Sequence, residues 1–386
     1  MTIQEPPPLG PPIESQWPPE PPADRQKMRG WTKWFLGISA FLVVVLIAGT
    51  VIRVPYDTLA PGGTLDLASR VSIKGTKTYA DRSDVMMLFV RERAHVNLWS
   101  LLQAKLDPSI DLVKQSNITG DQSQKEADLQ DVCAMAQSQD DARVAALRAL
   151  GYKVPVVRGL QVVDLPHTFS TAATTKNGPP VPHNLYAWKV LQPCDQIVSA
   201  DGHELKQPDD LSKIVKKHPV GSTVELGITR GGKPMTVHAK VVQGPQGPII
   251  GVDLGLRYRI PVDVNIDTND ISGPSAGLAI TLAIIDALTP GQLTGGKRVA
   301  VTGTIDPQGN VGEIGGLPQK ALAARNAHAQ ILIVPHCTDT GCRKDVATAR
   351  KRVGKNIEVA EVSTLDEALK VLRAAGGAAL PTRVAA

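Results

Sequence analysis

The sequence of 386 residues predicts an α+β protein with an N-terminal transmembrane helix, a β-rich domain and a C-terminal domain of mixed α/β structure. Three observations support this prediction. Residues 31–52 are almost wholly apolar, and roughly 20 such residues are enough to cross a bilayer. Residues 154–243 carry strand-like alternation, whereas residues 245–373 mix apolar strands with helical patterns without a strict repeat.

The N-terminal region predicts both an anchor and its orientation. Residues 1–30 are rich in proline and show no apolar periodicity, as in a disordered tail. Four basic residues precede or begin the apolar stretch, Arg25, Lys27, Arg29 and Lys33, whereas only Arg53 follows it closely. The positive-inside rule therefore places the tail in the cytoplasm and the rest of the chain outside. A cleaved signal peptide is the alternative, but the apolar run is longer than the roughly 7–15 residues of such peptides, which favours a retained anchor.

Composition limits the classes of function. The formal net charge of +5 is spread along the chain and does not indicate nucleic-acid binding. Cysteines are few: Cys133, Cys194, Cys337 and Cys342, of which only Cys337 has a neighbouring histidine, His336. This spacing lacks a zinc pattern, so we predict no metal and no cofactor. A disulfide could close the loop from Cys337 to Cys342 in an oxidising compartment, and two free thiols fit the sequence equally well.

Residues 53–153 carry no catalytic pattern. A strand-like run covers 85–90, helical runs cover 97–106 and 125–150, and Gly151 stands where a helix C-terminal glycine is expected. We interpret this part as a membrane-proximal extracytoplasmic segment that packs on the domains after it.

Residues 154–243 indicate a small β-rich domain. Val224, Leu226 and Ile228 alternate, a glycine turn covers 230–233, and apolar residues alternate back from Met235. A short amphipathic helix is expected over 209–217.

Two short motifs make this domain resemble PDZ domains of the bacterial protease type. They are Asp195-Gln196-Ile197-Val198 and Asp201-Gly202. The resemblance implies that an extended peptide adds to a sheet edge near Gly159, Leu160 and Gln161. Two departures leave a spacer with a blocked groove as the alternative: Cys194 replaces the usual glycine, and 166–185 is a long insertion.

The stretch around Ser275 predicts a turn into a buried helix. Gly273 and Pro274 are typical of a helix start, and the residues from Ala276 to Ile285 are almost all apolar. The Ser275 hydroxyl is either a helix N-cap or a nucleophile.

Lys320 lies on an apolar helical stripe formed by Leu317, Ala321, Ala324 and His328. Burial would disfavour the ammonium form and lower the lysine pKa, so that a neutral amine could act as a general base toward a serine. The alternative is a lysine whose stem packs while its ammonium stays in water.

These motifs make residues 245–373 resemble the catalytic domain of Lon-type serine peptidases. The matching motifs are Gly273-Pro274-Ser275-Ala276-Gly277, Thr302-Gly303-Thr304-Ile305 with Gly309-Asn310-Val311, and Gly315-Gly316-Leu317-Pro318-Gln319-Lys320. The resemblance implies Ser275 as nucleophile, Lys320 as base and Thr302 as an orienting hydroxyl. It also implies that Gly273, Pro274 and Ala276 shape the turn and the oxyanion site. Thr304 stands where the family usually has glutamate and receives no role.

The other elements of this domain follow from short local patterns. Apolar strands are expected at 262–266, 299–301, 331–334 and 357–362, and a capped final helix at 365–372. Residues 374–386 are expected to be a flexible tail.

The order of anchor, PDZ-like domain and Lon-like domain resembles a bacterial family of membrane-anchored Lon-like peptidases. No phosphate-binding Gly-x-x-x-x-Gly-Lys-Ser/Thr motif occurs in the sequence. The resemblance implies an ATP-independent serine endopeptidase that cleaves unfolded or flexible proteins outside the cytoplasm, and a possible hexameric ring.

Two other hypotheses remain. One is a non-enzymatic membrane-anchored PDZ adaptor or scaffold with an inactive Lon-like domain. The other is a conventional triad that uses His328 or His336, for which the sequence indicates no acidic partner.

Overall fold

The computed structural model describes residues 30–80, 83–119, 122–171 and 181–381. The predicted disordered tail therefore lies almost entirely outside the described residues. The chain divides into two compact units, residues 1–52 and residues 53–386.

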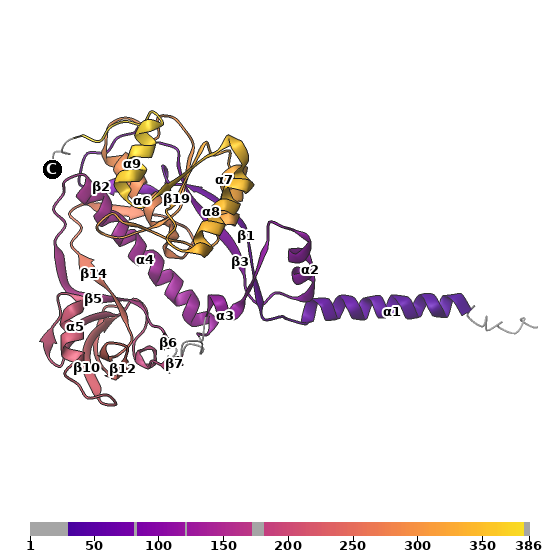
Figure 1. The fold of residues 1–386 in the computed structure, drawn as a ribbon, viewed down its shortest axis with the longest axis horizontal. Coiled ribbons are helices and arrows are strands. Elements are labelled where there is room, and N and C mark those ends of the chain that lie inside the picture. Colours follow the sequence, from indigo (N-terminus) through magenta and orange to yellow (C-terminus); the bar gives the residue numbers. More distant parts are fainter. Residues whose placement is uncertain (1–29, 81–82, 120–121, 172–180, 382–386) are drawn as a thin grey trace, which may run out of the picture. The chain divides into compact units, whose positions relative to one another are not determined.

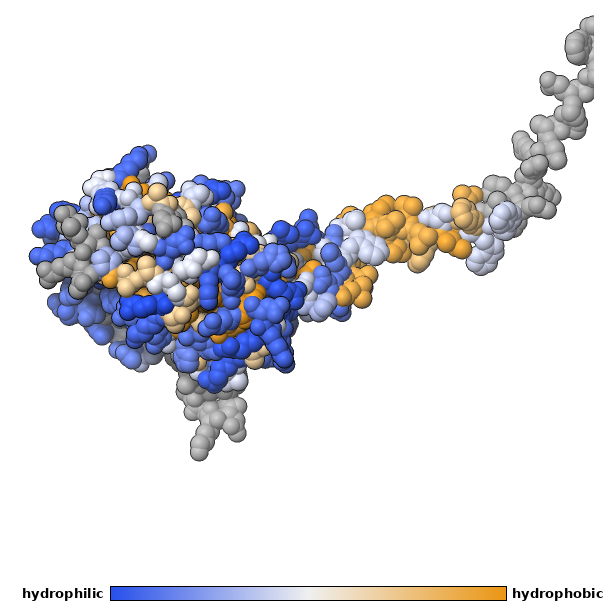
Figure 2. All heavy atoms as spheres, turned by 90° about the horizontal axis from the view of Figure 1, so that it is seen from above, coloured by the Kyte–Doolittle hydropathy of each residue, from blue (hydrophilic) through white to orange (hydrophobic). Residues whose placement is uncertain are grey.

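The first unit contains one helix, α1 (Gly30–Val51). Most of its apolar side chains are exposed, and Figure 2 shows hydrophobic residues along much of the helix. The 19 residues Lys33–Val51 are long and apolar enough to cross a membrane. This helix matches the predicted span in position and composition.

A six-stranded mixed sheet forms the centre of the second unit, in the order β20-β19-β16-β3-β1-β4. Figure 1 labels three of its strands, β1, β3 and β19. Its strands are β1 (Tyr56–Asp66), β3 (Val85–Arg93), β4 (Asp111–Lys114), β16 (Val299–Val301), β19 (Ile331–Pro335) and β20 (Glu358–Val362). β3, β16, β19 and β20 run parallel, and β1 runs antiparallel to both β3 and β4.

Three of the four strands from residues 53–153, β1, β3 and β4, are part of the same sheet as β16, β19 and β20 from the Lon-like region. Val85 pairs with Val299 and Met87 with Val301, so the segment that we expected to pack on the domains after it shares a sheet with them. An apolar run identifies a strand but not its partner, and here the partner lies far along the chain. The PDZ-like part is thus inserted between two halves of one domain.

Alternate residues of the central strands face two helical layers (Figure 1). Met87 and Val301 belong to the apolar cluster that includes α4 (Gln124–Ala149), α6 (Gly277–Leu288) and α9 (Leu365–Ala374). Met86 and Ala300 belong to the cluster that includes α7 (Leu317–Asn326) and α8 (Thr340–Val353). Because both faces are covered, the strands read as continuous apolar runs.

Shorter elements complete this domain. They are the pair β2 (Val71–Lys74) and β15 (Asp263–Ile266), the pair β17 (Thr304–Ile305) and β18 (Val311–Gly312), and the helices α2 (Leu98–Leu106), α3 (Gln115–Ile118), η2 (Pro274–Ala276) and η3 (Gly354–Asn356). After α9, the amides of Gly377 and Ala378 donate to the carbonyls of Leu372 and Gln292. The start of the predicted flexible tail is therefore tied to the domain.

The PDZ-like part has a second sheet, in the order β11-β10-β8-β5-β14. Its elements are β5 (Val156–Asp164), β6 (Thr168–Thr171), β7 (Val181–Asn184), η1 (Ala187–Lys189), β8 (Gln196–Ala200), β9 (His203–Glu204), α5 (Pro208–Val215), β10 (Thr223–Arg230), β11 (Lys233–Lys240), β12 (Val242–Gly244), β13 (Gly247–Ile249) and β14 (Asp253–Tyr258). Gly231 and Gly232 adopt positive φ in the predicted hairpin turn between β10 and β11. The edge strand β14 lies after residue 243, where the sequence predicted that the β-rich domain ends.

Two disulfides are present. Cys337 pairs with Cys342, which is one of the two alternatives that the sequence left open. Cys133 pairs with Cys194 and links α4 to the turn before β8, a pairing for which the sequence has no local signal. Cys194 has a φ of +67°, in the left-handed region that glycine adopts more readily than other residues.

Asp286 connects α6 to two loops of the same domain. It is 1% exposed and accepts hydrogen bonds from the amides of Ser83 and Leu293 and from the Ser83 hydroxyl. We expect Asp286→Ala to lower the free energy of unfolding by about 2–3 kcal/mol, because it leaves these buried donors unpaired. Urea denaturation of this variant and of the exposed control Asp263→Ala is the measurement. Equal midpoints for the two variants would contradict the expectation.

Candidate active site

The turn that carries Ser275 is held from one side by helix α4. Gly273 has a φ of +87°, which favours glycine, and its amide donates to the Asp131 carbonyl at 3.1 Å. The Ser138 hydroxyl donates to the Pro274 carbonyl at 2.8 Å. Two residues of α4, which the sequence predicted as a helix without a role, therefore position this turn.

The hairpin that begins at Thr302 holds the turn from the other side. The Ser275 carbonyl accepts from the Gly303 amide at 2.9 Å and from the Thr302 hydroxyl at 3.3 Å. Thr302 is fully buried. Its hydroxyl thus contacts the backbone of Ser275, and it can orient the serine through the turn.

Lys320 reaches the Ser275 hydroxyl from helix α7. Its side chain is 3% exposed, and its Nζ donates to Ser275 Oγ at 2.9 Å. The ammonium does not extend into water, as the alternative interpretation required. Burial lowers the lysine pKa from 10.5 to about 8, because a charged group in the apolar interior loses its hydration.

The helix-cap interpretation of Ser275 is not what the structure shows. Neither η2 nor α6 has a side-chain cap at its start, and the serine hydroxyl points to Lys320 instead. The predicted lysine stripe is correct for Leu317, Ala321 and Ala324, which are buried. His328 lies beyond the end of α7 and is exposed.

The three residues predicted to shape the turn and the oxyanion site differ in the hydrogen bonds that their backbone amides can donate. The Gly273 amide is used by Asp131, and Pro274 has no amide hydrogen. Ala276 is buried at the start of α6, where the amides and the helix dipole favour a negative charge.

A cleft of about 900 Å³ contains both Ser275 and Lys320. Its walls include the strand residues Phe89, Val90 and Arg91 from β3. Sequence reasoning missed these residues, although an apolar run ending in charged residues, as at 85–93, is the signal of a strand that leaves the core.

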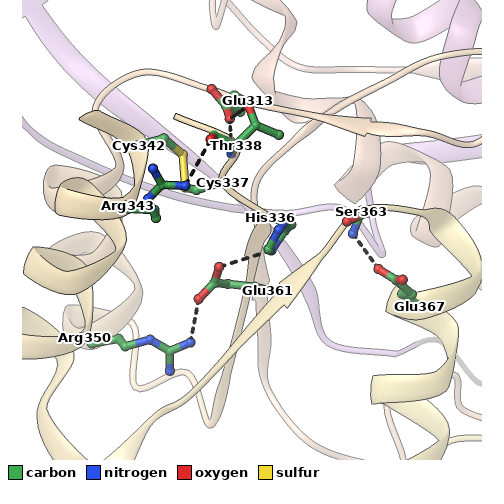
Figure 3. Close-up of polar contacts among 10 residues, drawn as sticks. All are labelled: Glu313, His336, Cys337, Thr338, Cys342, Arg343, Arg350, Glu361, Ser363 and Glu367. Carbon is green, nitrogen blue, oxygen red and sulfur yellow. Dashed lines mark hydrogen bonds and ion pairs between the residues drawn. A yellow bond between two sulfur atoms is a disulfide. The ribbon is translucent and has the colours of Figure 1, made fainter. Parts of the chain in front are cut away.

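The two histidines of the alternative triad do not contact Ser275. His336 Nδ1 lies 3.6 Å from Glu361, which also pairs with Arg350 (Figure 3). His336 therefore has an acidic partner, which the sequence did not indicate, but its side chain is 57% exposed. Next to it, Glu313 of the cleft wall accepts from the amide and hydroxyl of Thr338 in the loop closed by Cys337 and Cys342.

Gly159, Leu160 and Gln161, the predicted peptide-binding residues, lie inside the second sheet. Leu160 pairs with Ile197 of β8 on one edge and with Leu256 of β14 on the other. The strand edge at these residues is therefore occupied, because β14 enters the sheet from beyond the predicted domain boundary. Among the described residues, no group of three or more His, Cys, Asp and Glu side chains could hold a metal ion.

Comparisons with known proteins identify two parts of the chain. Residues 258–374 match the Lon protease (S16) C-terminal proteolytic domain, and residues 159–241 match the PDZ domain. The Lon protease of Trichlorobacter lovleyi is 39% identical over 99 residues, which are 26% of this chain and 11% of that protein. The Lon protease of Rickettsia typhi is 27% identical over 186 residues, which are 41% of this chain and 23% of that protein. The chain thus spans less than a quarter of the length of these two relatives.

A solved PDZ domain is also similar to part of the chain. It comes from an SdrC-like protein of Listeria monocytogenes and is 22% identical. The match covers 26% of this chain and 90% of that one, with a TM-score of 0.20.

Burial of the Lys320 amine should make the free energy of unfolding depend on pH. Between pH 8 and 10.5 the unfolded chain holds the Lys320 proton and the folded chain does not, so wild-type stability should rise with pH in this window. The free energy of unfolding should rise by about 3 kcal/mol over this window, because the Lys320 pKa is lower in the folded chain than in the unfolded chain. We expect Lys320→Met to be more stable than wild type near pH 7, with a difference that shrinks toward pH 10. Denaturation of both proteins across this range is the test, and a difference independent of pH would contradict it.

Proposed function

Since residues 258–374 are a Lon-type proteolytic domain and residues 159–241 a PDZ domain, we propose that this chain is a serine endopeptidase with Ser275 and Lys320 as its catalytic dyad. The observation that carries the proposal is the contact of 2.9 Å between the Lys320 amine and the Ser275 hydroxyl inside a substrate-sized cleft. A nucleophile needs a base within hydrogen-bond reach, and this pair meets that condition.

The proposed reaction starts with neutral Lys320. Its amine takes the proton from Ser275 Oγ as this oxygen attacks the carbonyl carbon of the peptide bond. The negative charge that develops on the carbonyl oxygen is stabilised by the amide of Ala276, next to the positive end of the α6 dipole. The protonated lysine then gives its proton to the leaving amine, and a water molecule releases the acyl group by the same steps in reverse order.

Burial of Lys320 serves this chemistry. An ordinary lysine with a pKa near 10.5 is almost fully protonated at neutral pH and cannot accept a proton. A pKa of about 8 leaves a useful fraction of neutral amine while the base stays strong enough for proton transfer. Thr302, Asp131 and Ser138 keep the serine turn in place, so the hydroxyl needs little reorganisation.

The proposed substrates are unfolded or flexible protein segments, cleaved without ATP outside the cytoplasm. An open cleft beside β3 suits an extended chain, and the sequence contains no phosphate-binding motif. Two disulfides are typical of an oxidising compartment, which supports an extracytoplasmic body anchored by α1. A hexameric ring remains a proposal that rests on resemblance.

The proposed dyad predicts how substitutions of Lys320 and of two histidines change the rate of peptide cleavage. Lys320→Ala and Lys320→Arg should each lower peptide cleavage by at least about 10²–10⁴-fold, because neither side chain can accept the serine proton. Wild-type kcat/KM should rise with pH through about 8, as Lys320 loses its proton. His328→Ala and His336→Ala should stay within a few-fold of wild type. Steady-state cleavage of one peptide by all these proteins is the assay, with circular dichroism as the folding control.

Covalent labelling separates an enzyme from an adaptor. Intact-mass analysis after treatment with a fluorophosphonate probe should show one added group on the wild type and none on Ser275→Ala. An active, folded Lys320→Arg protein, or equal labelling of Ser275→Ala, would refute the dyad.

Energy dependence can be tested directly. Hydrolysis of casein by the full chain in detergent should proceed at the same rate with ATP, without it and in the presence of an ATP-consuming enzyme. A several-fold stimulation by ATP would show that a partner ATPase is needed.

Topology can be tested in whole cells. A protease added outside should degrade the part after Arg53 and spare an epitope tag placed at the N-terminus. Loss of the tag with protection of the body would place the active site in the cytoplasm.

A further inference from the structure

Helix α2 carries large apolar side chains on its exposed side. Leu98, Leu102 and Leu106 recur every four residues and therefore share one face, which we call the outer face of α2. They are 36%, 47% and 76% exposed, whereas the buried residue of the helix is the small Ala104. A surface helix normally turns its large apolar residues inward. Figure 1 shows α2 apart from α4, α7 and α8, so these helices do not cover the outer face.

Polar residues flank the outer face. At 3.6 residues per turn, Lys105 lies on one side of it and Gln103 on the other, and both are exposed. Trp99 is next to the face and is 38% exposed. The carboxylate of Asp107, after the helix, accepts from the Ser109 amide at 2.8 Å and is thus turned toward its own loop. An apolar stripe with a tryptophan and a flanking lysine is typical of a helix that lies in a membrane interface.

The chain itself places the start of α2 close to the end of the proposed membrane span. Arg53 forms a β-bridge with Asn97, the N-cap of α2, and the Val54 amide donates to the Val96 carbonyl at 2.9 Å. Bridged residues of antiparallel strands lie about 5 Å apart. Arg53 follows Val51, the last residue of α1, by two positions, which is at most about 7 Å of chain. With α1 as the span, α2 therefore starts within roughly 12 Å of the point where the chain leaves the bilayer.

The size of the outer face fits a lipid surface better than a second copy of the chain. A helix of 9 residues is about 14 Å long and about 10 Å wide. Such a face is far smaller than the roughly 800 Å² per partner that a stable protein interface buries. A bilayer needs no matching surface, because acyl chains adapt to an apolar stripe of any size.

The cleft that contains Ser275 lies a short length of chain from the same point. Leu59 lines the cleft and follows Arg53 by six residues, which is no more than about 22 Å of chain. Leu59 pairs with Glu92 of β3, which also lines the cleft, and β3 leads through residues 94–97 directly into α2. A fixed position of α2 therefore also fixes the β3 wall of the cleft.

We propose that α2 lies in the lipid–water interface, with its outer face among the acyl chains, as a second attachment beside α1. This attachment holds the β3 wall of the cleft near the bilayer, so the preferred substrates are flexible segments that begin at the membrane, as in the juxtamembrane parts of membrane-anchored proteins. The inference rests on the anchor and the peptidase activity of the proposed function.

Depth-dependent fluorescence quenching tests the position of α2 without relying on catalysis. The full chain is reconstituted in vesicles of phosphatidylethanolamine and phosphatidylglycerol. Its four cysteines are paired, so a fifth cysteine can be labelled selectively in Leu102→Cys, Leu106→Cys or the exposed control Lys233→Cys. A lipid nitroxide near the headgroup should quench the two α2 labels at least about threefold more than the control, because an interfacial helix buries its apolar face only about 5–10 Å deep.

Two results would contradict the interfacial position. Equal quenching of all three labels would show that α2 stays in water. Protection of the α2 labels from aqueous iodide, without quenching by the lipid nitroxide, would assign the outer face to another copy of the chain.

Cleavage of an anchored peptide tests the consequence for substrates. One flexible peptide is offered to the full chain in these vesicles, either free or attached to a lipid through a spacer of about ten residues, which reaches the cleft when extended. Leu102→Gln with Leu106→Gln should cleave the anchored peptide at least about threefold more slowly than wild type, because the cleft loses its fixed height and the effective substrate concentration falls. The free peptide should be cleaved at the wild-type rate, which also shows that the variant is folded.

The matched control is Val220→Gln with Met235→Gln. These two residues of the PDZ-like part are 52% and 43% exposed, and their replacement should leave both rates unchanged. Equal slowing by both double variants, or no slowing by the α2 variant, would refute the substrate preference. Failure of the wild type to cleave either peptide would refute the peptidase, while the quenching result would still decide the position of α2.

Discussion

The contact between Lys320 and Ser275 is the constraint on which the rest of this structure depends. An amine in the interior must lose its hydration, so the fold has to exclude water around it and still leave the serine open to a substrate. The lysine comes from α7, on one face of the sheet, and the serine from the start of α6, on the other. The central sheet therefore fixes the distance between the two groups, and the strands on both sides must be in register for this contact to form.

The positions of Ser275 and Lys320 could be predicted from local signals, whereas their pairing was implied only by the resemblance to Lon-type peptidases. Gly273 and Pro274 specify a turn into a buried helix, and Lys320 stands on a stripe of apolar residues at helical spacing. The positive φ of Gly231 and Gly232 is likewise encoded within two residues, and the hairpin is where we expected it. Such features depend on the conformational preferences of a few neighbouring residues.

What the sequence could not reveal is which distant elements meet. Residues 85–90 read as a strand, but nothing in them identifies Val299–Val301 as the partner. The occupied edge at Leu160 was missed for the same reason, since the strand beside it begins ten residues after the predicted boundary at 243. Cys133 and Cys194 are 61 residues apart, and their pairing follows only from the packing of α4 against the second sheet.

The interrupted central sheet also determines how this chain can be made. β1 and β3 leave the ribosome well before β16, so β3 first exists with one unpaired edge and with Met86, Met87 and Leu88 exposed. Such an edge can pair with other chains, and contacts between distant residues form slowly. The intervening residues contain a compact core of their own, whose folding shortens the distance that β16 must close. We therefore expect the period of synthesis before β16 emerges to be the stage at which this chain is most prone to pair with other chains.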